Sequence, residues 1–415
     1  MLNYIDMNKL WTRDFSILTI GSAVSMLGNA VSGFAMGLMI YDYTDSTLLF
    51  ALFMVVYNLP KIILPLLVGP YMDRFSRKRV IYTLDFFSAT VFLAITVLLY
   101  FNFFNYVAFL FMAIIIGSTD SIYIVAYESL YPSLITKGNY TKAYSVSSLI
   151  YPIATTIMVP IAGVFYETVG LVPLFAFNAI SFFIAAIFET RIKTVEQHVQ
   201  ANLSQKFSIQ RYKADFKDGI SYLKREQGLL TIVAYFFCTT LASGAMGSLV
   251  LPFFKSTPGL GVQTYTLITS IATAGRMIGG FVQYRIKYPQ HLKYYIAIFV
   301  YTAICFLDGT YLFLPIFMMF IFQFLVGVLG VTSYNIRISA TQNYVTDDIR
   351  GRFNGIFQMI TTLGMIIGQL LAGLLGEFFM EQYLILGFMI FNVIAIVVIL
   401  LPRGEHVKKI YNNDV

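Results

Sequence analysis

Charged residues, histidines and cysteines are scarce in this sequence of 415 residues. Asp, Glu, Lys and Arg make up 12% of it, about half the usual share in a soluble protein. Three histidines and two cysteines leave little from which to build a metal site, so none is expected. We find no dinucleotide-binding loop, phosphate-binding loop or nucleophile elbow, which argues against an enzyme and against a cofactor. Cys238 and Cys305 both fall within apolar runs, so a disulfide framework is not expected.

Apolar residues dominate instead, at 58% of the chain with a mean hydropathy of +0.74. Runs of roughly 20 apolar residues recur, and each is long enough to cross a bilayer as a helix. The sequence therefore predicts an all-α integral membrane protein with twelve transmembrane helices, at Phe15–Tyr41, Leu48–Met72, Val80–Tyr100, Phe104–Ser129, Ala143–Tyr166, Leu171–Thr190, Leu229–Phe254, Tyr265–Tyr284, Tyr294–Tyr311, Phe313–Asn335, Phe353–Phe378 and Tyr383–Leu401.

A polar stretch at 191–228 divides these spans into an N-terminal half, 1–190, and a C-terminal half, 229–415, of six helices each. Within the linker, Phe216–Leu223 alternates charged and apolar residues at helical spacing, which predicts a helix lying at the membrane interface. Lys and Arg gather in alternate loops, and of the outer loops only one contains a basic residue, Lys255. Both termini are therefore expected in the cytoplasm. The net charge of +7 follows from this distribution and does not indicate nucleic-acid binding.

The two halves resemble each other when they are aligned at an offset of 210 residues. Glycines, basic residues and acidic residues at matching helix ends then coincide: Gly69 with Gly279, Arg77 with Lys287, Lys142 with Arg352, Ala162-Gly163 with Ala372-Gly373, and Glu167 with Glu377. This pattern predicts a parallel duplication, in which the halves are related by a pseudo-twofold axis along the membrane normal.

A short basic loop joins the second and third predicted helices and contains Gly69, Asp73, Arg74, Arg77 and Lys78. Its spacing resembles the loop signature of the major facilitator superfamily, with Ser76 where that family usually has glycine. The resemblance covers the whole chain and implies alternating access, with the loop acting as part of an inner gate. It also implies that Asp73 meets the start of helix 11, around Gly351–Asn354, as a carboxylate against a positive helix end.

Two further segments resemble the drug:proton antiporter branch related to macrolide exporters. Pro160 and Gly163 match part of a glycine- and proline-containing motif in helix 5, although they also suit an ordinary proline kink with a close helix contact. The segment Tyr131–Ile135 is similar to the proline-containing segment that follows helix 4 in that branch.

Ionisable residues inside predicted spans are the first candidates for a binding site, because they are costly there. Lys61 lies in the middle of helix 2, where it could bind an anionic group or pair with an acid. Asp120 could carry a proton, or could pair with Arg77 as an acid on helix 4 often does in this superfamily. Arg276 stays charged at any physiological pH and could clamp an anion or balance an acid. Asp85 and Glu128 are expected to pair with the arginines of the loops.

Helices 1, 4, 7 and 10 surround the substrate in this superfamily, so polar and aromatic residues on them are expected to line a cavity: Asn29, Tyr123, Tyr127, Thr239, Ser243, Gln323 and Tyr334. The resemblance implies a monomeric, multi-pass protein of the bacterial plasma membrane that exports small amphipathic organic compounds, with protons as the coupling ion. A lipid or lysolipid flippase, or an exporter of a specific metabolite or siderophore, is an alternative with the same fold. A non-transporting scaffold is less favoured, because the sequence contains no long soluble domain.

Overall fold

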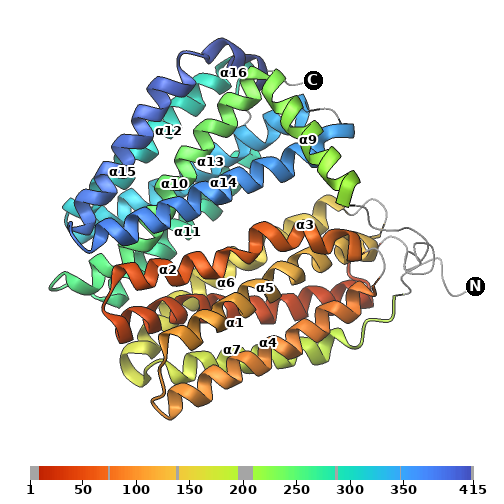
Figure 1. Ribbon diagram of the computed structural model, residues 1–415, viewed down its shortest axis with the longest axis vertical. Helices are drawn as coiled ribbons and strands as arrows, with labels where there is room; N and C mark the ends of the chain where they lie inside the picture. Colours follow the sequence, from red (N-terminus) through yellow and green to blue (C-terminus); the bar gives the residue numbers. More distant parts are fainter. Residues whose placement is uncertain are drawn as a thin grey trace, which may run out of the picture. The chain divides into compact units, whose positions relative to one another are not determined.

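The structure is a computed structural model, and it describes residues 9–72, 75–136, 140–194, 209–285, 288–345 and 347–412. Within these ranges all regular secondary structure is helical (Figure 1). The first half contains α1 (Arg13–Thr44), α2 (Thr47–Asn58), α3 (Pro60–Met72), α4 (Arg77–Tyr100), α5 (Tyr106–Leu130), η1 (Tyr131–Leu134), α6 (Tyr140–Val169) and α7 (Val172–Glu189). The second contains α9 (Ile209–Arg225), α10 (Gln227–Ser256), α11 (Val262–Arg285), η2 (Gln290–Leu292), α12 (Lys293–Thr310), η3 (Tyr311–Phe313), α13 (Ile316–Tyr344), α14 (Asp347–Gly376), α15 (Glu381–Ala395), the π-helical turn η4 (Ile396–Leu400) and α16 (Gly404–Tyr411).

The helices form two compact units. The first unit comprises Met1–Asp45 and Phe53–Phe207, and the second comprises Ser46–Leu52 and Ser208–Val415. The start of α2 therefore belongs to the second unit. There, Glu377 accepts hydrogen bonds from the Leu48 amide at 2.9 Å and from the Ser46 hydroxyl at 2.7 Å. These two bonds lower the pKa of Glu377 below its ordinary value.

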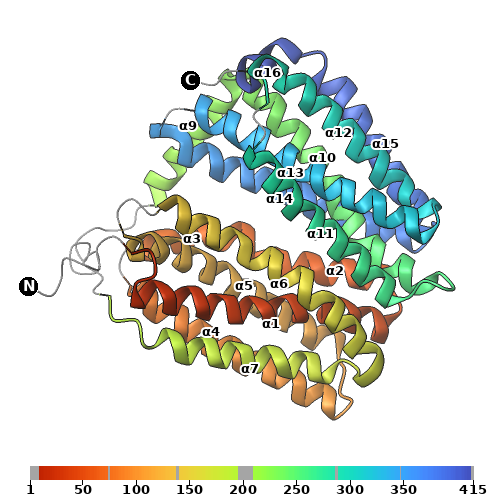
Figure 2. The same ribbon diagram turned by 180° about the vertical axis from the view of Figure 1, so that it is seen from behind.

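Both units use the same scheme of helix pairing. In the first unit, α1 packs on α6 and α7, α4 packs on α5 and α7, and α3 packs on α5. In the second, α10 packs on α14 and α15, α12 packs on α13 and α15, and α11 packs on α13. Figure 2 shows these sets from behind. Each helix of one set corresponds to the helix at the same place in the other half of the sequence, so the pairing scheme is repeated, as the predicted duplication requires.

Small residues set the closest of these contacts in equivalent places. A side chain at Gly117 of α5 would overlap the carbonyl oxygen of Tyr57, and one at Gly327 of α13 would overlap that of Ala272. Glycine is needed at both positions because the backbones of neighbouring helices touch there. Gly117 and Gly327 are separated by the same 210 residues as the pairs in the sequence alignment.

Eleven helices in the described part of the chain are long and apolar enough to cross a membrane. The predicted span at Tyr265–Tyr284 is not among them. It forms α11, whose 24 residues are enough to cross a membrane. Its many threonines and glycines make it less apolar than the eleven helices that qualify. The structure therefore has one candidate span fewer than the twelve predicted, and the span that does not qualify is α11.

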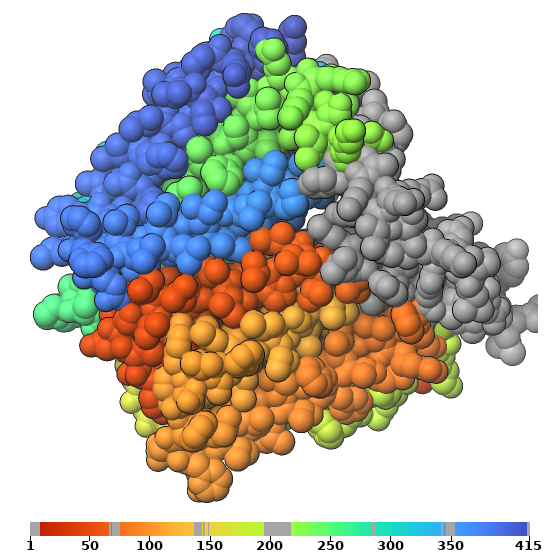
Figure 3. Space-filling model, in the orientation of Figure 1, coloured from red at the N-terminus to blue at the C-terminus, as the bar shows by residue number. Residues whose placement is uncertain are grey.

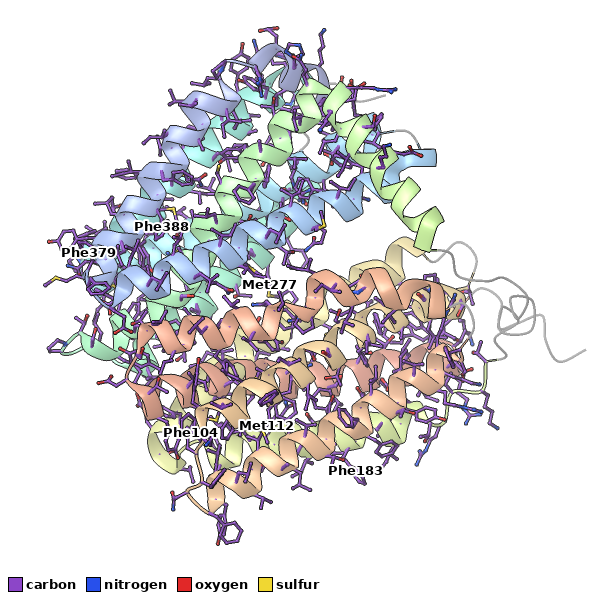
Figure 4. The ribbon with its side chains drawn as sticks, viewed as in Figure 1. Phe104, Met112, Phe183, Met277, Phe379 and Phe388 are labelled. Atoms are coloured by element: carbon purple, nitrogen blue, oxygen red, sulfur yellow. The ribbon has the colours of Figure 1, made fainter. Side chains whose placement is uncertain are left out.

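Lipid is the natural environment of the outer surfaces of both units. Large apolar side chains are exposed along the helices, such as Phe183 of α7 at 51% and Phe379 after α14 at 58% (Figure 4). Figure 3 shows one face of the second unit, on which α14 and α15 lie beside α10. A water-soluble protein does not expose apolar side chains on this scale. The helix predicted within the linker is present as α9, and it packs on α14 and α10. Its place at the membrane interface stays a prediction.

Candidate functional site

A charged cluster in the first unit brings together two of the residues predicted from the sequence, Lys61 and Asp120. The hydroxyl of Tyr57 donates to Asp120 Oδ2 at 2.6 Å, and Lys61 Nζ lies 4.0 Å from the same oxygen. The Lys61 ammonium also lies 3.8 Å from the centre of the Tyr57 ring. The tyrosine therefore contacts both charges, with its hydroxyl on the anion and its ring face under the cation.

A break in the second predicted span positions this cluster. The predicted helix Leu48–Met72 is divided into α2 and α3 by Leu59, because Pro60 has no amide hydrogen and disfavours a helical conformation in the residue before it. Tyr57 stands at the end of α2 and Lys61 in the first turn of α3. Asp120 is supplied by α5, whose Gly117 allows its backbone to touch the carbonyl of Tyr57.

The cluster is only partly enclosed, with side-chain exposures of 28% for Lys61 and 22% for Asp120. The tyrosine bond is short and involves a charged acceptor, which is the stronger kind of hydrogen bond. The lysine is at the limit of direct ion pairing, so it is the weaker of the two partners. Asp120 is thus a carboxylate with one firm donor and one cation that can be displaced.

A ladder of tyrosines continues along α5 from this site toward its C-terminus. The rings of Tyr123 and Tyr127 are 6.1 Å apart, and those of Tyr127 and Tyr131 are 5.1 Å apart. Tyr123 shares a hydrogen bond with Ser22 of α1 at 3.2 Å, and Tyr127 shares one with Ser147 of α6 at 3.4 Å. Both tyrosines were predicted to line a cavity, and the structure places them where α1, α5 and α6 meet.

Part of the basic loop can be located in the structure. Arg77 begins α4 and donates to the carbonyl of Ser129 at 2.8 Å, while Lys78 donates to the carbonyl of Thr194 at 2.8 Å. Ser76, which replaces the glycine of the family signature, caps α4 by accepting from the amide of Arg79. Gly69 lies in α3. Asp73 and Arg74 lie outside the described residues, so the predicted contact of Asp73 with helix 11 does too.

The polar residues predicted in the second half belong to the second unit. Gln323 of α13 is buried and donates to Asp308 of α12 at 2.9 Å. Arg276 of α11 is exposed and close enough to Asp308 to act on it electrostatically. Tyr334 is 53% exposed and its ring lies 5.3 Å from the guanidinium of Arg337.

Other predicted residues have local roles. The carbonyl of Asn29 accepts from Ser32 in α1, and Ser32 in turn accepts from Asn178 of α7. Pro160 and Gly163 lie within α6, which continues as one helix past Pro160 and past a second proline, Pro152. In the second unit, Thr239 donates to Asn392 at 3.2 Å, and Ser243 is exposed.

The expected pairing of Asp85 with a loop arginine is not found among the described residues, which do not include Arg74. Asp85 is 1% exposed and forms no ion pair with any residue that the structure describes. It faces Glu189 of α7 instead. Sequence reasoning missed Glu189 because it closes an apolar run just before a basic segment and reads as a helix end. It also missed Asp308, Tyr57 and Arg337, since tyrosines and residues near span ends are common in any membrane protein.

Comparison with known proteins identifies the family. The model of the transmembrane secretion effector family matches residues 7–413. The chain belongs to this family of major facilitator superfamily transporters. Membership makes it a multi-pass membrane transporter rather than an enzyme.

Relatives of this family member have low sequence identity. An uncharacterized MFS-type transporter of Bacillus subtilis, YkuC, is 27% identical over 311 residues, which is 72% of this chain and 70% of the relative. Macrolide efflux protein A of Streptococcus pyogenes is 22% identical over 381 residues, covering 88% of this chain and 90% of the relative.

Solved structures share the fold. The nucleoside transporter NupG aligns with a TM-score of 0.70 and 14% identity, over 94% of this chain and 98% of its own. A bacterial homologue of the iron transporter ferroportin, in an inward-facing state, aligns with a TM-score of 0.71 and 14% identity, over 97% of this chain and 99% of its own.

Proposed function

We propose that this transporter exports amphipathic organic compounds from the bacterial cytoplasm in exchange for protons, and that Asp120 is the residue at which the exchange takes place. One observation carries the proposal: the Asp120 carboxylate is held by Tyr57 and Lys61 at a break in a transmembrane helix. Broken helices and ionisable residues within spans are the usual marks of a transport site.

The geometry around Asp120 suits exclusive binding of either a proton or a cation. While the carboxylate is ionised, Tyr57 and Lys61 balance its charge. A proton removes that charge, and the cationic group of a substrate can take the place of Lys61, which at 4.0 Å is the weaker partner. Because one carboxylate serves both, a bound proton and a bound substrate exclude each other, as exchange requires.

The surroundings favour an amphipathic substrate over a sugar. Tyr57, Tyr123 and Tyr127 offer aromatic faces with single hydroxyls, and such sites suit flat, weakly polar molecules and organic cations. The similarity to macrolide efflux protein A supports the same class. The distribution of Lys and Arg supports an orientation with both termini in the cytoplasm.

The test is uptake into energised inverted membrane vesicles, using a panel of fluorescent amphipathic cations and macrolides. Uptake is measured with and without a proton uncoupler, for the wild type, Asp120→Asn and Glu167→Gln. Asn has nearly the same shape as Asp but cannot bind a proton. Glu167 is an exposed acid of α6 in the same unit, so its substitution controls for the loss of one negative charge.

We expect uncoupler-sensitive uptake by the wild type and by Glu167→Gln, and at most one-hundredth of that rate for Asp120→Asn. Uncoupler-sensitive uptake that survives Asp120→Asn would keep proton exchange and exclude Asp120 as its site. A wild type that transports no compound of the panel would overturn the proposed substrate class and favour a lipid, a nucleoside-like metabolite or a siderophore.

A further inference from the structure

The first unit contains a second pair of ionisable residues, which makes no hydrogen bond or ion pair with the described residues of the cluster around Asp120. Asp85 of α4 and Glu189 of α7 face each other, and each is only 1% exposed. None of their four carboxyl oxygens has a hydrogen-bond partner of ordinary geometry among the described residues. Polar groups buried to this degree are almost always satisfied, so an arrangement with four orphaned oxygens needs an explanation.

The packing of α1 leaves room for this pair. A side chain at Gly21 would come within 3.0 Å of Cγ and Oε1 of Glu189. The absence of a side chain at Gly21 therefore allows the Glu189 carboxyl to lie directly against the α1 backbone. The site is not a chance gap, because α7, which carries Glu189, packs on both α1 and α4.

Among the described residues, the groups that face the pair from neighbouring helices supply no positive charge. α5 contributes Tyr123, whose hydroxyl lies near Glu189 and is hydrogen-bonded to Ser22 of α1, and Asp120, which acts electrostatically on Asp85. Neither acid forms an ion pair with any Lys or Arg that the structure describes. Of the basic residues in the first turn of α4, Arg77 donates to the carbonyl of Ser129 and Lys78 to the carbonyl of Thr194.

Two carboxylates that face each other out of water cannot both be ionised, because the free-energy cost of their desolvation adds to that of their mutual repulsion. We propose that Asp85 and Glu189 form a proton-binding site that holds at least one proton at neutral pH. A proton between the carboxyls converts their repulsion into a hydrogen bond, as in other carboxyl pairs that share a site. The inference concerns the first unit alone and does not depend on which compound the transporter carries.

Infrared spectroscopy of the full-length purified protein tests the site, because a protonated carboxyl has a carbonyl stretching band that a carboxylate lacks. All variants carry Asp120→Asn, so that Asp120 does not contribute. Spectra at neutral pH are compared for this background and for the background with Asp85→Asn, with Glu189→Gln, and with Glu167→Gln as the exposed control. Each carboxamide keeps the shape of the acid, and thermal unfolding of each variant verifies that it is folded.

We expect the protonated-carboxyl band to fall or to shift in frequency in both Asp85→Asn and Glu189→Gln, and to stay unchanged in Glu167→Gln. A fall in both variants indicates two bound protons, because each substitution removes one protonated acid. A shift without a fall indicates one shared proton, because the remaining buried acid keeps it and loses the hydrogen bond to the other carboxyl. A band unchanged by both substitutions, or absent in the background, would overturn the proposal. A second result would also overturn the proposal: the band disappears when choline in the buffer is replaced by Na⁺ at constant ionic strength. The two acids would then bind a metal cation instead of a proton.

Discussion

At the residue scale, the hydroxyl of Tyr57 distinguishes the Asp120 site from a simple ion pair. It is the only group that donates a hydrogen bond to Asp120 among the described residues. The ring of the same residue supports Lys61. Removing the oxygen alone therefore separates the two roles, since phenylalanine keeps the ring face and loses the donor.

We expect Tyr57→Phe to reduce the rate of proton-coupled uptake by roughly ten- to a hundredfold, since a hydrogen bond to a charged group contributes about 1.5–3 kcal/mol. The rate is measured in inverted vesicles with a transported compound of the panel. Tyr100→Phe, at a residue that is 70% exposed at the end of α4, is the matched control and should transport like the wild type. Equal rates for both variants would show that the Asp120 site does not need the donor.

The contact between Lys61 and Asp120 could not be predicted from the sequence, although both residues could. Lys61 and Asp120 were predicted as separate candidates because a charge inside an apolar run is conspicuous. Their pairing with each other was not predicted: Lys61 was expected to bind an anion or an unspecified acid, and the partner considered for Asp120 was Arg77. The lysine and the aspartate are 59 residues apart in the sequence. Whether their side chains meet depends on how α3 and α5 are rotated about their axes, which an almost uniformly apolar helix does not reveal.

At the scale of elements, the approach of α5 to the end of α2 holds the site together. Gly117 permits this approach, and the break at Leu59 and Pro60 turns Lys61 toward the same place. A larger residue at Gly117 has no flexible neighbour to displace, because the atom it would meet is a main-chain oxygen.

Gly117→Ala is therefore expected to destabilise the protein by about 1–3 kcal/mol, the usual cost of overpacking, and to lower transport by moving Tyr57. The midpoint of thermal unfolding in detergent and the uptake rate are measured together. Gly33→Ala is the control, since nothing lies within 4 Å of a side chain there, and alanine in a helix is neutral or slightly stabilising. If Gly117→Ala unfolds at the wild-type temperature, the two helices are not in contact as described.

At the scale of the whole molecule, two units with the same helix pairing differ in their buried charges. At an offset of 210 residues, Lys61 corresponds to Ile271, Asp120 to Gly330, Asp85 to Tyr295 and Glu189 to Ile399. The duplicated architecture is therefore retained in both halves, whereas these four ionisable residues are present only in the first. This asymmetry is consistent with placing proton binding in the first unit.

The membrane topology can be tested through α11, the predicted span with the lowest apolar content. We expect Gln263→Cys to react with an impermeant thiol reagent from the outside of cells, and Gln290→Cys to react only in inverted vesicles. Both positions are exposed, whereas Cys238 and Cys305 are buried and should give little background. Labelling of both positions from one side would show that α11 does not cross the membrane, and would contradict the twelve-span topology.

The sequence by itself determined the class of the protein, the positions of nearly all spans, the duplication and the family resemblance. These follow from local properties, namely the length of apolar runs, the distribution of Lys and Arg, and short motifs. Only the tertiary structure decided that Tyr57 joins Lys61 to Asp120 and that Asp85 faces Glu189. Such contacts join helices far apart in the chain, and they depend on helix rotation and on glycines whose importance appears only when two backbones touch.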